Sequence, residues 1–128
     1  MSSEENIKTV IHWMEVVNQK DLDAIDKLAD EIYAADYVYH DPGFPNFEPG
    51  PEPIKQFIRQ ILKDYPDLHS ATEDIFAVSD KVASRGVITG MHATTGETLN
   101  LQWIGISRFS GGKIVEEWQV EVPVPIKG

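Results

Sequence analysis

Cysteine is absent from the sequence. Its absence excludes disulfides, thiolate nucleophiles and cysteine ligands to a metal. Long apolar runs are missing too, and none approaches the roughly 20 residues of a membrane-spanning helix. The first five residues, M-S-S-E-E, are acidic and lack the basic and then apolar order of a signal peptide. We therefore expect a cytoplasmic protein.

Basic residues are scarce. The chain has 11 Lys and Arg against 21 Asp and Glu, which gives a formal net charge of −10. Such a charge repels nucleic-acid phosphates and anionic membrane surfaces, and no basic cluster offsets it. We expect no nucleic-acid or membrane partner, and the balance favours a neutral or weakly charged small molecule as ligand.

Histidine is also sparse, with four residues scattered along the chain. No two of them have the close helical spacing of an H-x-x-x-H zinc motif. We expect no metal site.

The composition that remains is ordinary for a globular protein, with 41% hydrophobic and 25% charged residues. A chain of 128 residues has the usual size of one domain. It can bury about two-thirds of its unfolded surface, which leaves room for a core and one enclosed cavity. We expect a single domain over residues 1–128.

Three amphipathic helices are predicted in the first half. Apolar residues recur with a period near 3.6 over residues 7–17, 22–32 and 54–65. Ser2 and Glu5 form a capping box before the first helix, and Asp21 can cap the second. Pro51 suits the first turn of the third helix.

An extended run at 37–40 stops at D-P-G, because proline and glycine interrupt regular structure. Residues 41–53 are rich in proline and carry Phe44 and Phe47. This composition predicts a rigid loop. A lid over a cavity and a plain connection both fit it, and the residues alone favour the connection.

From Ser70 onward the periodicity changes to two, which predicts strands at 75–78, 82–92, 99–109 and 114–122 with turn-like connections. Helices followed by an antiparallel meander indicate an α+β fold with the helices on one face of the sheet. Gly86, Gly90 and Gly105 lie inside these strands, where glycine often bends a sheet or admits a ligand. A sheet curved around three helices forms a cone, although bending also has a purely structural explanation.

The last strand, G-K-I-V-E-E-W-Q-V at 112–120 followed by P-V-P at 123–125, resembles the closing strand of SnoaL-like proteins, typically G-K-I-V-E-H-W-D-V. Four further segments agree in order: Y-H-D-P at 39–42, P-E-P-I-K-Q-F at 51–57, P-D-L-H at 66–69 and T-G-M-H at 89–92. The similarity to SnoaL-like polyketide cyclases, a family of the nuclear transport factor two-like superfamily, covers nearly the whole chain.

This resemblance implies the cone-shaped fold of nuclear transport factor two and ketosteroid isomerase, usually as a homodimer. It also implies ring closure by intramolecular aldol condensation with neither a metal nor an organic cofactor. In that chemistry a late aspartate is the general acid and base, near a histidine on the preceding strand.

The sequence departs from the family at both positions. Gln119 replaces the aspartate, and the histidine position falls near Gly105. An amide cannot exchange a proton near neutral pH. Two functions therefore stay open: an isomerase or lyase that cyclises, isomerises or hydrates a neutral hydrophobic carbonyl compound, and a non-catalytic small-molecule binding or carrier protein.

Three residues are candidates for proton transfer. His40 ends a strand before the proline-rich loop and titrates near neutrality, unless it is a structural histidine. Asp41 is a second candidate base, although it also suits the start of a D-P-G turn. Glu117, like Glu121, shares a strand face with Gln119, or else is a solvated charge at the rim.

The ligand-binding candidates depend on the turn at 111–112. A bulged three-residue turn puts Trp103, Gly105 and Gln119 on one face, whereas a strict two-residue turn pairs Gln119 with Ile104. The resemblance favours the first arrangement. We expect the pocket to be lined by Trp103, Gly105, Gln119, Tyr39, Phe44 and His92.

On the same arrangement, the opposite face of the sheet carries Ile104, Ile106, Ile114, Trp118 and Val120. This face is too apolar to be left in water. We expect a homodimer formed through Ile104, Ile106, Trp118 and Val120.

Overall fold

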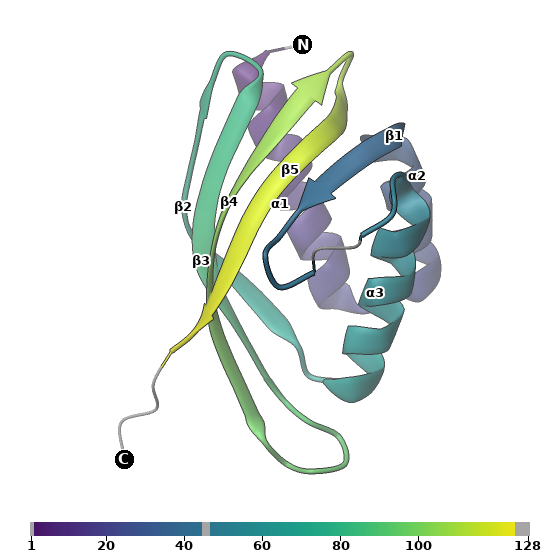
Figure 1. Ribbon diagram of the computed structural model, residues 1–128, viewed down its shortest axis with the longest axis vertical. Coiled ribbons are helices and arrows are strands. Elements are labelled where there is room, and N and C mark those ends of the chain that lie inside the picture. Colours follow the sequence, from purple (N-terminus) through teal and green to yellow (C-terminus); the bar gives the residue numbers. More distant parts are fainter. Residues whose placement is uncertain (1, 45–46, 125–128) are drawn as a thin grey trace.

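The computed structural model describes residues 2–44 and 47–124. Within these residues the chain forms three helices, α1 (Ser3–Gln19), α2 (Leu22–Ile32) and α3 (Pro51–Asp64). The same part holds five strands, β1 (Tyr33–His40), β2 (His69–Val78), β3 (Lys81–Met91), β4 (Thr98–Ser110) and β5 (Lys113–Pro123). The strands form one curved sheet, and the helices lie on its concave side (Figure 1). The predicted α+β cone is confirmed.

The helices begin where the capping residues predict. The Ser2 hydroxyl accepts a hydrogen bond from the Glu5 N–H at 3.1 Å. The Asp21 carboxylate accepts from two N–H groups of the first turn of α2. Pro51 stands in the first turn of α3. In the described residues, no helix is both long and apolar enough to cross a membrane.

The sheet has the strand order β1-β5-β4-β3-β2. Strands β2 to β5 form the predicted antiparallel meander, although β2 begins earlier than expected, at His69. Strand β1 pairs with β5 in parallel, so the sheet is mixed rather than wholly antiparallel. Alternation along one strand cannot reveal this pairing, because the partner lies at the other end of the chain.

The turn between β4 and β5 has two residues. Ser110 pairs with Lys113, and both Gly111 and Gly112 have positive φ, 60° and 80°. Two-residue hairpin turns of this kind need positive φ at both central positions, which glycine adopts at little cost. The predicted three-residue turn is therefore wrong.

A bulge in β5 restores the predicted faces. Val115 has no partner of its own, because the pairs on either side of it involve consecutive residues of β4. The extra residue shifts the alternation by one, so Gln119 pairs with Gly105 as expected. Ile114 precedes the bulge and is 1% exposed in the core, so its predicted place on the outer face is wrong.

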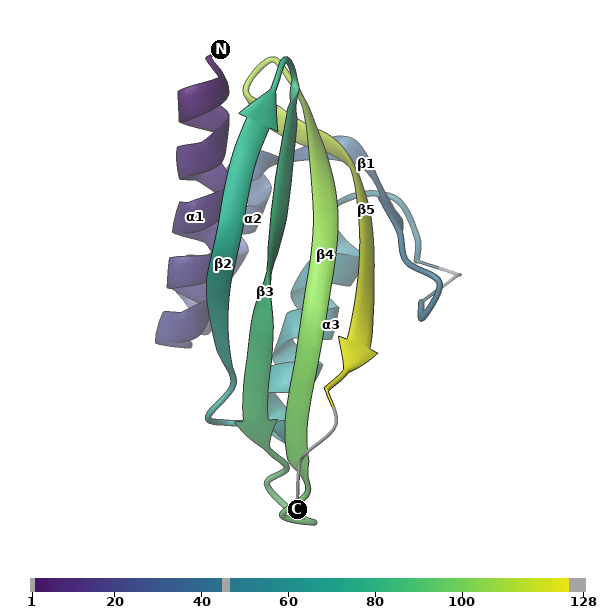
Figure 2. The ribbon, with the colours of Figure 1, turned by 90° about the vertical axis from the view of Figure 1, so that its left-hand side faces the viewer.

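The core fills one end of the concave side. Its members from β3, β4 and β5 are Val82, Phe109 and Ile114, which come from the strand ends beside the β2–β3 and β4–β5 turns, and α1 and α2 pack over them. Strand β1 adds Tyr33, Ala34 and Tyr37. Helix α3 packs against α2 and β1 and faces the other half of the sheet (Figure 1). Figure 2 looks onto the convex face, where the strands lie in front of α3.

Candidate functional site

A row of polar side chains lies on the concave side of β5. Residues in register on neighbouring strands share a face, and inward-facing residues alternate along the strand. The row consists of Glu117, Gln119 and Glu121, each half-buried, and their partners on β4 are Ser107, Gly105 and Trp103. The predicted shared face of Trp103, Gly105 and Gln119 is thus present.

Glu117 is held by hydroxyl groups. The Tyr37 hydroxyl donates to its Oε1 at 2.6 Å, and the Ser107 hydroxyl donates to its Oε2 at 2.5 Å. Loss of hydration raises the pKa of Glu117, and the hydroxyl donors, which include Tyr33, oppose that rise. Burial also raises the pKa of Tyr37 far above its ordinary value. With both oxygens engaged, Glu117 joins β1 to β4 and has little capacity left for a ligand.

A second carboxyl group lies just beyond the end of β1. Asp41 is 5% exposed and accepts hydrogen bonds from the Tyr39 hydroxyl and the Gly43 N–H, both at 2.8 Å. The Glu121 carboxyl lies close enough to Asp41 for the two carboxyl groups to influence each other. Burial first, and then Asp41, raise the pKa of Glu121 to about 7. Glu121 can therefore take up or release a proton near neutral pH.

Gln119 belongs to the same group. Its Nε2 donates to Glu121 Oε1 at 2.6 Å and so favours the ionised form of Glu121. Its cross-strand partner on β4 is Gly105. A Cβ added at Gly105 would lie 3.4 Å from the Gln119 amide oxygen. Gln119 therefore faces the site and orients the neighbouring carboxyl.

Trp103 covers the sheet beside Glu121. The side chain is 3% exposed, and its ring packs directly over Gly86 on β3. A Cβ at Gly86 would lie 2.3 Å from the ring and 2.2 Å from the carbonyl oxygen of Ala71. Gly86 is thus required by close packing. Trp103 and Glu121 are cross-strand partners, so both side chains lie on the concave face.

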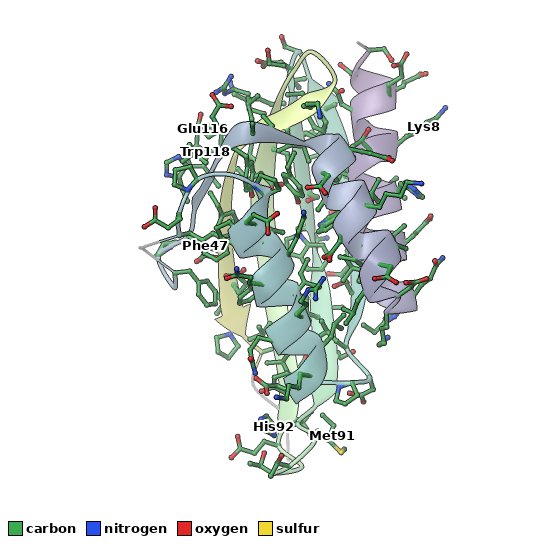
Figure 3. The ribbon with its side chains drawn as sticks, turned by 90° about the vertical axis from the view of Figure 1, so that its right-hand side faces the viewer. Lys8, Phe47, Met91, His92, Glu116 and Trp118 are labelled. Carbon is green, nitrogen blue, oxygen red and sulfur yellow. The ribbon has the colours of Figure 1, made fainter. Side chains whose placement is uncertain are left out.

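Aromatic residues of the loop after β1 pack beside this group. The Phe47 ring lies 5.1 Å from the Tyr39 ring, and the Phe44 ring lies 5.0 Å from the Phe57 ring on α3. Figure 3 shows Phe47 between α3 and the β5 edge. Residues 45–46 of the loop and Pro125 of the P-V-P segment lie outside the described residues.

His40 lies on the opposite face of the sheet. Its Nε2 is 2.7 Å from Glu116 Oε2, and its ring stacks on Trp118 at 5.5 Å. Figure 3 shows Glu116 and Trp118 near the β1–β5 edge. Strand alternation explains this place, because neighbouring Tyr39 faces inward. The structure does not bring His40 to the carboxyl pair.

His92 lies in the turn that follows β3. Its Nδ1 accepts hydrogen bonds from the Thr94 and Thr95 N–H groups at 3.2 and 3.3 Å, and the ring contacts Tyr65 edge-on. Figure 3 shows His92 at one end of the molecule, away from Phe47. The structure therefore places His92 in the turn and apart from the row on β5.

Two surface hollows also lie apart from this row. One, of about 330 Å³, lies between α1 and β2, and the other, of about 510 Å³, lies beside the start of α1. Neither contains a residue of the row, so an enclosed pocket at Gln119 stays a prediction. Among the described residues, no three acidic or histidine side chains are arranged to hold a metal ion.

The sequence indicates Glu121 as well as Glu117 as a possible replacement for the family's carboxylate, because both share a strand face with Gln119. What distinguishes Glu121 is its closeness to Asp41, which raises the pKa of Glu121 and depends on the parallel pairing of β1 with β5. Alternation did indicate that Glu121 faces inward with Gln119. No local signal indicated that Asp41 would reach it.

The sequence matches the family model of the SnoaL-like domain over residues 10–117. Wild-type IdmH, a putative polyketide cyclase from Streptomyces antibioticus, is 27% identical, with a TM-score of 0.77 and 91% of each chain covered. AclR, a putative hydroxylase from Streptomyces galilaeus, is 26% identical, with a TM-score of 0.78 over 94% of this chain and 77% of that one. TsrD from Streptomyces laurentii, at 19% identity and a TM-score of 0.79 over 94% and 90% of the two chains, shares the fold. No curated protein matches the sequence.

Proposed function

This chain belongs to the SnoaL-like domain family, and from that membership we propose that it is an enzyme acting by acid and base chemistry on a neutral, hydrophobic carbonyl compound. The reaction is an aldol-type cyclisation, an isomerisation or a hydration, and needs no cofactor. The observation that carries the proposal is the Asp41–Glu121 pair, because a carboxyl with a pKa of about 7 can both accept and return a proton at neutral pH.

The first step breaks a C–H bond next to the substrate's carbonyl group. The ionised Glu121 takes the proton, and the bonding electrons move into the carbonyl to form an enolate. In a cyclisation, the enolate carbon then bonds to a second carbonyl carbon of the same molecule, and the new alkoxide takes the proton back from Glu121. The carboxylate is regenerated, and no oxidant or reductant is consumed.

The other polar residues of the site support this carboxyl. Asp41 raises its pKa, and Tyr39 holds Asp41 through a 2.8 Å hydrogen bond. Gln119, at the position that resembles the family's aspartate, cannot exchange the proton itself. Its amide binds Glu121 instead, so the base of this chain lies two residues further along the same strand face.

A binding or carrier function is the alternative, and the amide at position 119 favours it. The fold does not choose between the two, because one fold supports many unrelated functions. Only a test of proton transfer separates them.

Hydrogen–deuterium exchange provides that test. In D₂O, the enzyme should accelerate loss of the α-proton NMR signal of fused-ring ketones such as 1-tetralone, and the rate should rise with pH through about 7. Glu121→Gln should lower the rate roughly 10²–10⁴-fold. Glu116→Gln, on the outer face of the same strand, should retain it. If 1-tetralone bound without faster exchange, the carrier function would stand.

We also propose that two copies pair through the outer face of β4 and β5. Ile104 and Val120 are cross-strand partners there, as are Ile106 and Trp118. Ile104 is 58% exposed, and the other three are exposed as well. The nearby charges of this face are already paired: Arg108 binds Glu116, and Arg85 binds Glu73 and Asp74. A second copy could therefore approach without unpaired like charges.

The cytoplasmic location stays a prediction.

A further inference from the structure

Trp103 carries a hydrogen-bond donor that the protein does not use. Within the described part of the chain no side chain accepts from its indole Nε1–H, yet the residue is only 3% exposed. In the same part, no polar side-chain atom is both shut off from solvent and without a partner. The nitrogen must therefore keep contact with solvent, on the concave side that Trp103 faces.

The hydroxyl donors of the row are already engaged, Tyr39 with Asp41, and Tyr37 and Ser107 with Glu117. The Gln119 amide uses one of its two N–H bonds on Glu121. A ligand oxygen at this place would therefore find the Trp103 N–H and the second N–H of Gln119 as donors that cost no existing bond.

The position of this donor is fixed. The ring lies against Gly86, where even a methyl group would clash with it. Trp103 is also the cross-strand partner of Glu121, and such partners have Cβ atoms about 4.5–5.5 Å apart. The two side chains therefore border the same stretch of the concave face.

We propose that the Trp103 indole N–H binds the substrate's carbonyl oxygen and stabilises the negative charge that forms there when Glu121 removes the neighbouring proton. This assignment rests on the proposed function and adds the electrophilic half of the site. A fixed donor aimed at a developing oxyanion stabilises the transition state more than the substrate, so it accelerates the step.

Indole NMR signals test the contact without altering Trp103. The chain has three tryptophans, and Trp13→Phe and Trp118→Phe assign two of the three ¹⁵N–¹H signals. Added 1-tetralone should move the Trp103 signal downfield, and tetralin, the same ring system without the oxygen, should not. No change with 1-tetralone, or an equal change with both compounds, would overturn the proposal.

Kinetics provide the second test. Trp103→Phe should lower the 1-tetralone exchange rate about 10²–10³-fold, the usual loss for an oxyanion donor. Trp118→Phe, on the outer face, should not lower it. If 1-tetralone exchanged its α-protons but did not shift the Trp103 signal, Trp103 would be rejected as the hydrogen-bond donor and the proposed enzymatic function would stand. If 1-tetralone shifted the Trp103 signal but exchanged no protons, the contact would stand as a binding interaction and the proposed enzymatic function would be rejected.

Discussion

A proton on Glu121 is bound more tightly in the folded chain than in the unfolded chain, because burial and Asp41 raise the pKa of this carboxyl from 4.5 to about 7. Its contribution to stability is therefore full below pH 4.5 and is lost as the pH rises through 7. Glu121→Gln should remove this loss, so the variant should gain stability relative to the wild type between pH 5 and pH 8. Urea unfolding at the two pH values measures the difference, and parallel pH profiles would contradict the assignment.

Gly86 gives a second test at the scale of one residue. Gly86→Ala places a methyl group 2.2 Å from the Ala71 carbonyl oxygen and against the Trp103 ring, so strand or ring must move. We expect a loss of about 1–3 kcal/mol in the free energy of unfolding. Gly90→Ala, in the same strand, meets its nearest atom at 3.3 Å and should cost much less. Equal losses in thermal unfolding would argue against the close packing.

Strand β1 is held to the rest of the sheet partly by the buried bond from Tyr37 to Glu117. Tyr37→Phe keeps the ring and leaves one oxygen of Glu117 without this donor, which should cost about 1–3 kcal/mol. Hydrogen exchange of the β1 amides should report the loss locally, with faster exchange in β1 than in β3. Uniform acceleration over the whole sheet would mean that the bond does not secure β1 in particular.

The elements that the sequence predicts are those set by nearby residues. Ser2 and Asp21 cap their helices through N–H groups a few positions away, and the meander follows from alternation and short turns. The bulge at Val115 was not predictable, because one extra residue leaves the strand composition unchanged. The parallel partner of β1 was not predictable either, so the closeness of Asp41 to Glu121 could not be foreseen.

For the whole molecule, the decisive quantity is the mass in solution. The exposed apolar face of β4 and β5 predicts a dimer, and Trp118→Glu should dissociate it, because a carboxylate at a dry interface would have no partner. Light scattering at micromolar concentration should give twice the chain mass for the wild type and the chain mass for the variant. Trp13→Phe, on α1, is the matched control and should stay dimeric. A monomeric wild type would remove the basis of this proposal.

The parallel pairing of β1 with β5 also sets the order of events when the chain folds. Tyr37 and Glu117 are 80 residues apart, so closing this contact costs more chain entropy than forming any hairpin of the meander. Asp41 and Glu121 come together, beside Tyr37 and Tyr39, only when β1 pairs with β5. The proposed proton-transfer activity should therefore return during refolding only when β5 pairs with β1.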